Sequence, residues 1–314
     1  MRVTQNQFSE SLVGRLNALT SRQYNLQSQV SSGLRLQAPS DDPAAMQNVL
    51  NYKTSKAEQE QYARSISTLQ SRAAGAYNVL QQLNTLSSNA SAVATSAGDV
   101  LKSGTDLSGY AATVSSDIEN ALVQVNKQDP ATGQYLFGGT TSRQPPFVAT
   151  RDASGKITGV TYQGNASVNQ SEIAAGSTVT ADVVGANTSG SGPRGLITDS
   201  NSGADLFNHL ISLRDHLLAN DRTAILNTDT PALRQDEDNL IFHVSLNGAL
   251  QSRLETAATS ASDNATSLDT MISHAAAADL VQTMVQLNQA QNSYQAALQS
   301  GAKIMQLSLL NYIQ

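Results

Sequence analysis

The sequence predicts a mainly α-helical fold. We expect an elongated multi-helix bundle or coiled coil formed by the N- and C-terminal arms, with a small antiparallel β domain inserted in mid-chain. Apolar residues recur at three- and four-residue steps over long stretches near both ends, which is the periodicity of amphipathic helices. Between residues 146 and 184 the period changes to two, as in strands. Large aromatic residues are rare, with no Trp and 5 Phe, so Ala, Leu and Val must pack thin helical layers.

The first two predicted helices are separated by a sharp break. Apolar spacing predicts one helix over residues 4–32, and Gly33 suits the left-handed conformation that commonly ends a helix. A polar residue of the Ser-Asp-Asp-Pro run at 40–43 can cap a second helix, and the proline of that run fits the first turn. This second helix is expected from about residue 44 to residue 97, a length typical of bundles and coiled coils.

A third helix and the β-rich insert follow. After a glycine-containing break, an apolar stripe from Leu107 to Val125 predicts the helix. Turn-forming residues at 152–155 and 163–165 then separate short alternating segments, and the stretch 185–195 is predicted as a flexible connector. The segments predicted as strands are residues 147–150, 157–162, 166–173 and 178–184.

Helical periodicity resumes after the connector. A short helix is marked by Leu206, Leu210, Leu213 and Leu217. A heptad-like series that starts near residue 231 predicts a long helix running to about residue 272. Its seam contains the polar residues Asn247 and Gln251, which can set the register of a coiled coil.

These elements predict three regions, two of them built from both ends of the chain. Residues 1–38 and 275–314 are expected to form a terminal coiled coil, and residues 39–140 and 204–274 a bundle of long helices. Residues 141–203 form the β-rich inserted domain, expected on the outside.

Both termini carry apolar stripes with little charge. From residue 280 to residue 314 the only charged side chain is Lys303. Such a stripe can be ordinary core of one antiparallel bundle, or it can be a surface that other subunits cover. Because both stripes lie at the extremities, and side chains such as Val281 and Val285 lie off the main seam, we favour assembly. The predicted interface residues are Phe8, Leu12, Leu16, Leu19, Leu26, Val30, Leu280, Met284, Leu287, Tyr294, Leu298, Met305, Leu309 and Leu310.

Composition excludes several classes of function. The net charge of −6 gives no broad basic footprint, so nucleic acid is not expected as a partner. With no Cys there is no disulfide, thiolate nucleophile or Cys-ligated metal. No apolar stretch approaches the roughly 18 residues needed to cross a bilayer. The N-terminus also lacks the features of a cleavable signal peptide, so export would need another route.

No motif rises to a catalytic, cofactor or metal site, and we do not expect an enzyme. The G-x-G-x-x-G match at 190–195 contains Pro193 and opens no convincing helix, which favours a flexible loop. His209 and His216 lie two turns apart on one predicted helix, and we interpret them as a solvated face. The acidic run at 236–238 lies early in a helix, where the macrodipole favours negative charge. The segment 199–203 resembles a calcium loop with its glycine misplaced.

The segment Ser31–Ala45 strongly resembles the N-terminal signature of the bacterial flagellin superfamily. Its Pro-Ser-Asp-Asp-Pro form is more similar to hook–filament junction proteins, a class of hook-associated protein, than to flagellin. The segments 135–140 and 160–164 resemble the mid-region of that class, and the C-terminal arm resembles its last helix. The resemblance is weaker from residue 168 to residue 233. The residues that carry the signature are Gly33, Pro39, Ser40, Asp41, Asp42 and Pro43.

This resemblance implies a non-enzymatic structural protein of the bacterial flagellum, found outside the cell and exported through the flagellar type III channel without a cleaved signal. It would form a ring of subunits between a hook-side hook-associated protein and flagellin. A cytoplasmic export chaperone would hold the C-terminal helix before secretion. No cofactor, metal, nucleic acid or membrane insertion is implied.

The sequence leaves two alternative functions open. The chain could be flagellin itself, which would polymerise indefinitely on a seed, whereas a junction protein adds a limited layer. It could also be a secreted adhesin or effector whose β insert binds a host ligand. Deletion of residues 146–184 would then abolish activity, but it would leave filament attachment intact in a junction protein.

Overall fold

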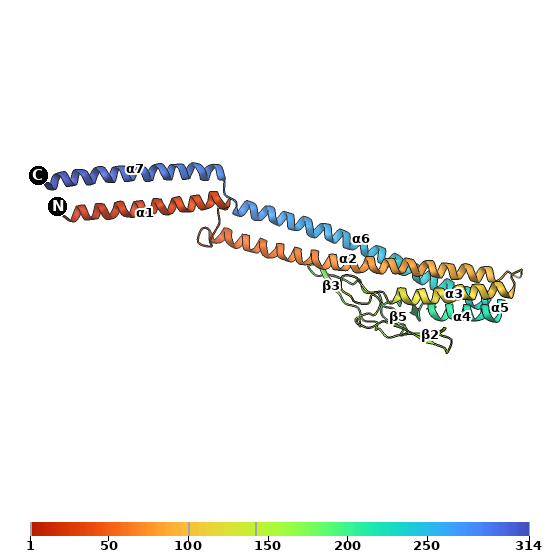
Figure 1. The fold of residues 1–314 in the computed structure, drawn as a ribbon. Coiled ribbons are helices and arrows are strands. Elements are labelled where there is room, and N and C mark those ends of the chain that lie inside the picture. The colour runs from red at the N-terminus through yellow and green to blue at the C-terminus, as the bar shows by residue number, and fades with distance from the viewer. Residues whose placement is uncertain (1, 100, 142, 314) are drawn as a thin grey trace. The chain divides into compact units, whose positions relative to one another are not determined.

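A computed structural model describes the backbone of residues 2–99, 101–141 and 143–313, and side chains within residues 10–303 apart from positions 100 and 142. The chain divides into two compact units (Figure 1). The first comprises residues 1–58 and 264–314, and the second comprises residues 59–263. The two boundaries fall within helices α2 (Pro43–Ala97) and α6 (Thr230–Ala276).

In the first unit, α1 (Arg2–Ser32) lies beside α7 (Leu280–Ile313) (Figure 1). Gly33 has φ +70° and its N–H donates to the carbonyl of Gln29 at 2.9 Å, which confirms the predicted C-terminal cap. The link after α1 is tied to the link before α7, because the N–H of Arg35 donates to the carbonyl of Ala276 at 2.7 Å. The two terminal helices are thus joined at their inner ends by backbone hydrogen bonds.

The predicted restart at residues 40–43 is also confirmed. Asp42 Oδ1 accepts from the N–H of Ala45 at 3.0 Å and so caps α2, which begins at Pro43. Asp41 Oδ2 accepts from two consecutive N–H groups, those of Gln37 and Ala38, each at 2.9 Å. Asp42 therefore caps α2, whereas Asp41 fixes the turn that precedes it.

The helices of the second unit enclose the main core. α3 (Gly104–Val125) begins with a capping box in which Ser103 and Asp106 satisfy one another's backbone N–H groups. α4 (Leu206–Ala219) lies beside α3 and is followed by the short α5 (Arg222–Ala224), a π-helical turn η1 (Ile225–Asp229), and α6 (Figure 1). The predicted stripes on α3 and α4 are confirmed, since these residues are all buried: Leu107, Ala111, Val114, Ile118, Ala121, Val125, Leu206, Leu210, Leu213 and Leu217.

The β insert consists of small sheets. β1 (Phe147–Arg151) and β2 (Ile157–Tyr162) form an antiparallel hairpin, and β3 (Ser171–Ala174) and β4 (Ser177–Val179) form another. β6 (Thr198–Asp199) lies between β5 (Ala186–Asn187), which is parallel to it, and β7 (Ala204–Asp205), which is antiparallel. The predicted turn at 152–155 is confirmed, with Gly155 at φ +85°.

Two predicted strands are too long. The third begins at Ser171 instead of residue 166, because Asn165 Oδ1 accepts from the N–H of Ser167 and organises a turn there. The fourth ends at Val179 instead of residue 184, because Asp182 Oδ2 accepts from the N–H of Asn169 at 2.8 Å and draws that part of the chain away from the hairpin. At both places, hydrogen bonds between backbone N–H groups and side-chain oxygens take the place of hydrogen bonds between strands.

The stretch 185–195 is not the flexible connector that its composition predicts. It contains β5, and the buried amide of Asn187 donates to the carbonyls of Ser191 and Pro193 at 2.8 and 2.7 Å. A side chain added at Gly195 would place its Cβ 2.1 Å from the carbonyl oxygen of Thr198. One buried amide and one tightly enclosed glycine therefore fix this loop.

Candidate assembly surface

The face of α1 that meets α7 carries apolar residues at alternating steps of four and three. Leu26 is buried, and the other members of the row are half-buried. This is the spacing of a coiled-coil seam. The seam residues of α1 are Leu12, Leu16, Leu19, Gln23, Leu26 and Val30.

The opposing row on α7 follows the same spacing with smaller residues. Thr283, Ala290 and Gly301 are buried, and the other members of this row are half-buried. Gln23 crosses the seam and donates from Nε2 to the carbonyl of Ala290 at 3.1 Å. Because several residues of this row are small, the backbones of α1 and α7 can lie close together. The contact with α1 therefore buries little of the apolar surface of α7. The seam residues of α7 are Thr283, Leu287, Ala290, Tyr294, Ala297 and Gly301.

The predicted stripe of α7 is consequently divided between two faces. Leu287 and Tyr294 belong to the seam, whereas the other described members of the stripe point away from α1 and are exposed. We name the exposed set the outer face of α7: Leu280, Val281, Met284, Val285 and Leu298. The predicted interface residues Phe8, Met305, Leu309 and Leu310 have side chains that lie outside the described residues.

The outer face of α7 is chemically suited to bind another apolar surface. Val281 is 77% exposed and Val285 is 61% exposed, and together with Leu280 and Met284 they occupy the first two turns of the helix. The nearest carboxylate, Asp279, is engaged in capping, since its Oδ1 accepts from the N–H of Gln282 at 3.0 Å. A contiguous exposed apolar patch of this kind marks an interaction site more often than a bare surface.

The signature segment holds the base of the terminal helix pair. Besides the turn held by Asp41 and the cap made by Asp42, Arg35 donates to the carbonyl of Ala275 at 3.1 Å and lies 3.6 Å from the Asp42 carboxylate. Pro39 and Ser40 are exposed. The signature thus joins the end of α1 to the start of α2 and to the end of α6.

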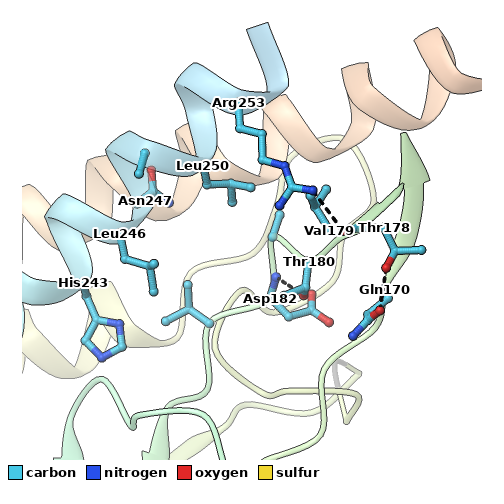
Figure 2. A pocket seen from close by; sticks show the side chains of 13 residues that line it. Gln170, Thr178, Val179, Thr180, Asp182, His243, Leu246, Asn247, Leu250 and Arg253 are labelled. Atoms are coloured by element: carbon cyan, nitrogen blue, oxygen red, sulfur yellow. Dashed lines mark hydrogen bonds between the residues drawn. The ribbon is translucent and has the colours of Figure 1, made fainter. Parts of the chain in front are cut away.

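A second apolar surface lies in the other unit, where α6 passes the segment that follows β4 (Figure 2). This groove has a volume of about 460 Å³. Leu246 and Leu250 face it from α6, and Arg253 at one end donates to the hydroxyl of Ser177 at 3.2 Å. The lining residues are Gln170, Thr178, Val179, Thr180, Ala181, Asp182, Val183, His243, Leu246, Asn247, Ala249, Leu250 and Arg253.

Two titratable side chains of the groove, Asp182 and His243, have partners outside it. Asp182 forms a buried ion pair with Arg72 at 2.8 Å. Burial lowers the pKa of His243 to about 4, so this imidazole is neutral at pH 7. Its Nε2 donates to the carbonyl of Gly195 at 3.2 Å. The groove therefore offers an apolar surface and one cation rather than an acid–base couple.

The prediction that His209 and His216 form a solvated helix face is wrong. Each ring nitrogen Nδ1 lies within 2.8 Å of a buried carboxylate, that of Asp236 or Asp229. The acidic run at 236–238 is likewise not only a response to the helix macrodipole, since Asp236 is 1% exposed and paired. Within the part of the chain that the structure describes, no three His, Asp or Glu side chains converge to hold a metal ion. None of the helices searched there combines the length and apolarity that a membrane span needs.

Comparison by sequence gives no match, since no family model fits the chain and no curated protein is significantly similar to it. Solved structures do match. One described as a flagellar hook-associated protein from Vibrio parahaemolyticus has a TM-score of 0.63 at 18% identity, over 76% of this chain and 100% of that one. FlgL of Xanthomonas campestris has a TM-score of 0.57 at 16% identity, over 71% of this chain and 99% of that one.

A third match is the flagellar junction protein FlgL from Legionella pneumophila. Its TM-score is 0.53 at 13% identity, over 73% of this chain and 99% of that one. At such identities these likenesses show a shared fold: helices that enclose a small β insert. The neighbours are structural proteins of flagella, and nearly the whole of each of them is matched.

Proposed function

We propose that this chain is a structural protein of the bacterial flagellum that joins a hook-side hook-associated protein to the flagellin filament. The observation that carries the proposal is the shared fold, because nearly the full length of several hook-associated and junction proteins superimposes on this chain. The signature at residues 31–45 supports the same assignment independently, since it forms the caps and ties at the base of the terminal helices.

In this role the protein acts by assembly and not by catalysis. The α1–α7 pair forms the inner part of a ring of subunits, and the outer face of α7 binds neighbouring copies and the proteins on either side. The long helices form the middle layer and residues 141–203 the outer domain. Before assembly the chain leaves the cell without a cleaved signal, and an export chaperone covers the C-terminal helix.

The exposure of the outer face of α7 supports this reading. In a lone chain Val281, Val285 and Met284 leave apolar area in water at a cost of about 25 cal/mol per Å². Burial against another subunit recovers that free energy. A low share of charged residues, 14% of the chain, also reduces repulsion between stacked copies.

Deletion of the gene tests the proposal. A junction protein predicts cells with hooks that carry no filament and with flagellin released into the medium. Loss of flagellin polymerisation itself would identify the chain as the filament subunit instead. Normal filaments together with lost adhesion to a host ligand would identify an adhesin. Complementation with a chain lacking residues 146–184 restores attachment only if the β insert is not needed for the junction.

A further inference from the structure

Two His–Asp pairs connect α4 to the η1–α6 segment. His209 Nδ1 lies 2.8 Å from Asp236 Oδ2, and His216 Nδ1 lies 2.7 Å from Asp229 Oδ2. The earlier histidine meets the later carboxylate, as two antiparallel helices require. The two histidines are seven residues apart on α4, and the two carboxylates are seven residues apart on the η1–α6 segment. The pairs therefore form two successive contacts between these segments, which we call rungs.

The carboxylates are buried and fully engaged. Asp229 and Asp236 are each 1% exposed, whereas the side chains of His209 and His216 are 23% and 31% exposed. The second oxygen of Asp236 accepts from the N–H of Asp205 at 2.8 Å, and that of Asp229 accepts from the hydroxyl of Ser212 at 2.7 Å. Protons can therefore reach each rung from solvent only on its histidine side.

The rung at His216 depends on an irregular backbone. Asp229 is the last residue of the π-helical turn η1, in which the hydroxyl of Thr230 donates to the carbonyl of Ile225 at 2.9 Å. A π turn adds one residue and rotates the following side chains about the helix axis, and such turns are frequent at functional sites. Here the π turn contains Asp229, the residue whose carboxylate contacts His216 of α4.

The electrostatic surroundings of the rungs are acidic. The charges that act on His209 are those of Asp236 on α6, Asp205 on β7 and Asp229 on η1. In the described part of the chain, ion pairs to Asp229 and Asp236 come from the two histidines alone. The neighbouring Glu237 is turned to α2, where it accepts from the hydroxyl of Ser88 at 2.8 Å. Among the residues that the structure describes, no Lys or Arg is therefore paired with either carboxylate to balance its charge in place of a histidine.

We propose that the two rungs form a latch between α4 and the η1–α6 segment, and that the His209 rung makes this latch proton-operated: it holds while His209 is protonated and loosens when His209 releases its proton. The inference does not rest on the proposed function. When the imidazole deprotonates, the ion pair becomes a hydrogen bond between a neutral imidazole and a buried carboxylate whose charge is no longer balanced.

The direction of the pH dependence follows from the proton affinities. Burial lowers the pKa of His209, but the hydrogen bond and charge of Asp236 outweigh it and the net pKa is raised. Burial raises the pKa of Asp236 despite its bond to His209. Both groups bind protons more tightly when folded. Where Asp236 is ionised, the His209 rung is therefore complete below the ordinary histidine value of about 6.5, and it is lost as the pH rises through the raised pKa of His209.

Hydrogen exchange of the α4 amides in the full chain tests the latch. We expect the opening equilibrium of α4, corrected for intrinsic exchange, to increase by up to about tenfold per pH unit across the histidine titration. The His209→Gln/His216→Gln variant should lose this slope, and His274→Gln, a change at an exposed position on α6, should keep it. Equal slopes in the wild type and the double variant would overturn the proposal.

A measurement on the wild-type chain covers the case in which the double variant fails to fold. NMR titration of the imidazole of His209 should give a midpoint above the ordinary histidine value of about 6.5. A midpoint at or below that value would show that the rung does not hold its proton, and the latch would be rejected.

Discussion

Leu12 of α1 packs directly over Gly301 of α7. A Cβ placed on Gly301 would lie 2.7 Å from Leu12 Cδ2, closer than side-chain atoms approach one another, while the rest of Leu12 stays at 3.7 Å. Gly301 is buried at the end of the seam that also contains Ala290 and Thr283. The absence of a side chain at this position is what allows Leu12 of the opposite row to fit.

Gly301→Leu should therefore separate the terminal helices. Overpacking of this kind costs about 1–3 kcal/mol. In a strain lacking the gene, we expect the variant to restore far fewer attached filaments than the wild-type chain does. Leu12→Ala combined with Gly301→Leu should recover attachment, because it vacates the space that the new side chain needs.

Gly301→Ala is the matched control. Only the flexible tip of Leu12 would have to move, and alanine is favoured over glycine in a helix by about 1 kcal/mol. Attachment should remain at the wild-type level. Full activity of Gly301→Leu alone would show that α1 and α7 do not pair through this face in the assembled flagellum.

Charge on the outer face of α7 should block assembly without unfolding the chain. Val281→Asp/Val285→Asp places two carboxylates where we expect apolar contact with another subunit, so filament attachment should be lost. Both positions are exposed, and the unfolding midpoint of the purified chain should stay unchanged. Gln289→Glu, at an exposed position of α7 outside the outer face, is the control. Attachment by the double variant would remove the outer face from the interface.

The helices could be predicted because their ends depend on neighbouring residues. Gly33 ends α1 through its own left-handed backbone, and Asp42 and Pro43 start α2 within one turn. The stripe on α3 became core because a 3.6-residue period records burial directly. In contrast, the period of α7 predicts an apolar helix without revealing which face meets α1. The face of α7 that meets α1 is determined by small residues such as Gly301 and Thr283, which do not belong to the apolar stripe.

The connector at 185–195 and the two histidines were mispredicted for different reasons. Asn187 is held by hydrogen bonds within its own loop. The Gly and Ser content of that loop predicts flexibility, because composition does not reveal these bonds. His209 and His216 were predicted to be solvated because the carboxylates that they contact lie in the following η1–α6 segment. A signal for them did exist: the two histidines and the pair Asp229 and Asp236 share a spacing of seven, which two antiparallel helices bring into register.

The β insert should depend on the buried ion pair between Arg72 of α2 and Asp182. Both side chains are at most 10% exposed, and Arg72 also donates to the carbonyl of Leu136 at 3.3 Å. Arg72→Met leaves a buried carboxylate without its cation and should destabilise the second unit by about 3–5 kcal/mol in urea unfolding. Arg72→Met/Asp182→Asn removes the charge, so part of the loss should be regained. Equal losses in the two variants would mean that the carboxylate is not the source of the penalty.

His243 should make the chain sensitive to acid. Its pKa is lowered to about 4 by burial, so the folded state binds this proton less tightly than the unfolded state, whose value is about 6.5. The stability that His243 contributes is complete above pH 6.5 and is lost as the pH falls toward 4, by about 3 kcal/mol in all. This sign is opposite to that of the His209 rung and acts in a lower pH range.

Unfolding free energies of wild-type and His243→Gln chains between pH 4 and pH 7 measure this contribution. Glutamine can still donate to the carbonyl of Gly195 but does not titrate, so the difference between the two chains should shrink or reverse as the pH falls. Other carboxylates titrate in both chains and cancel in that difference. A difference that stays constant with pH would mean that His243 takes up its proton as readily in the folded protein as in the unfolded one.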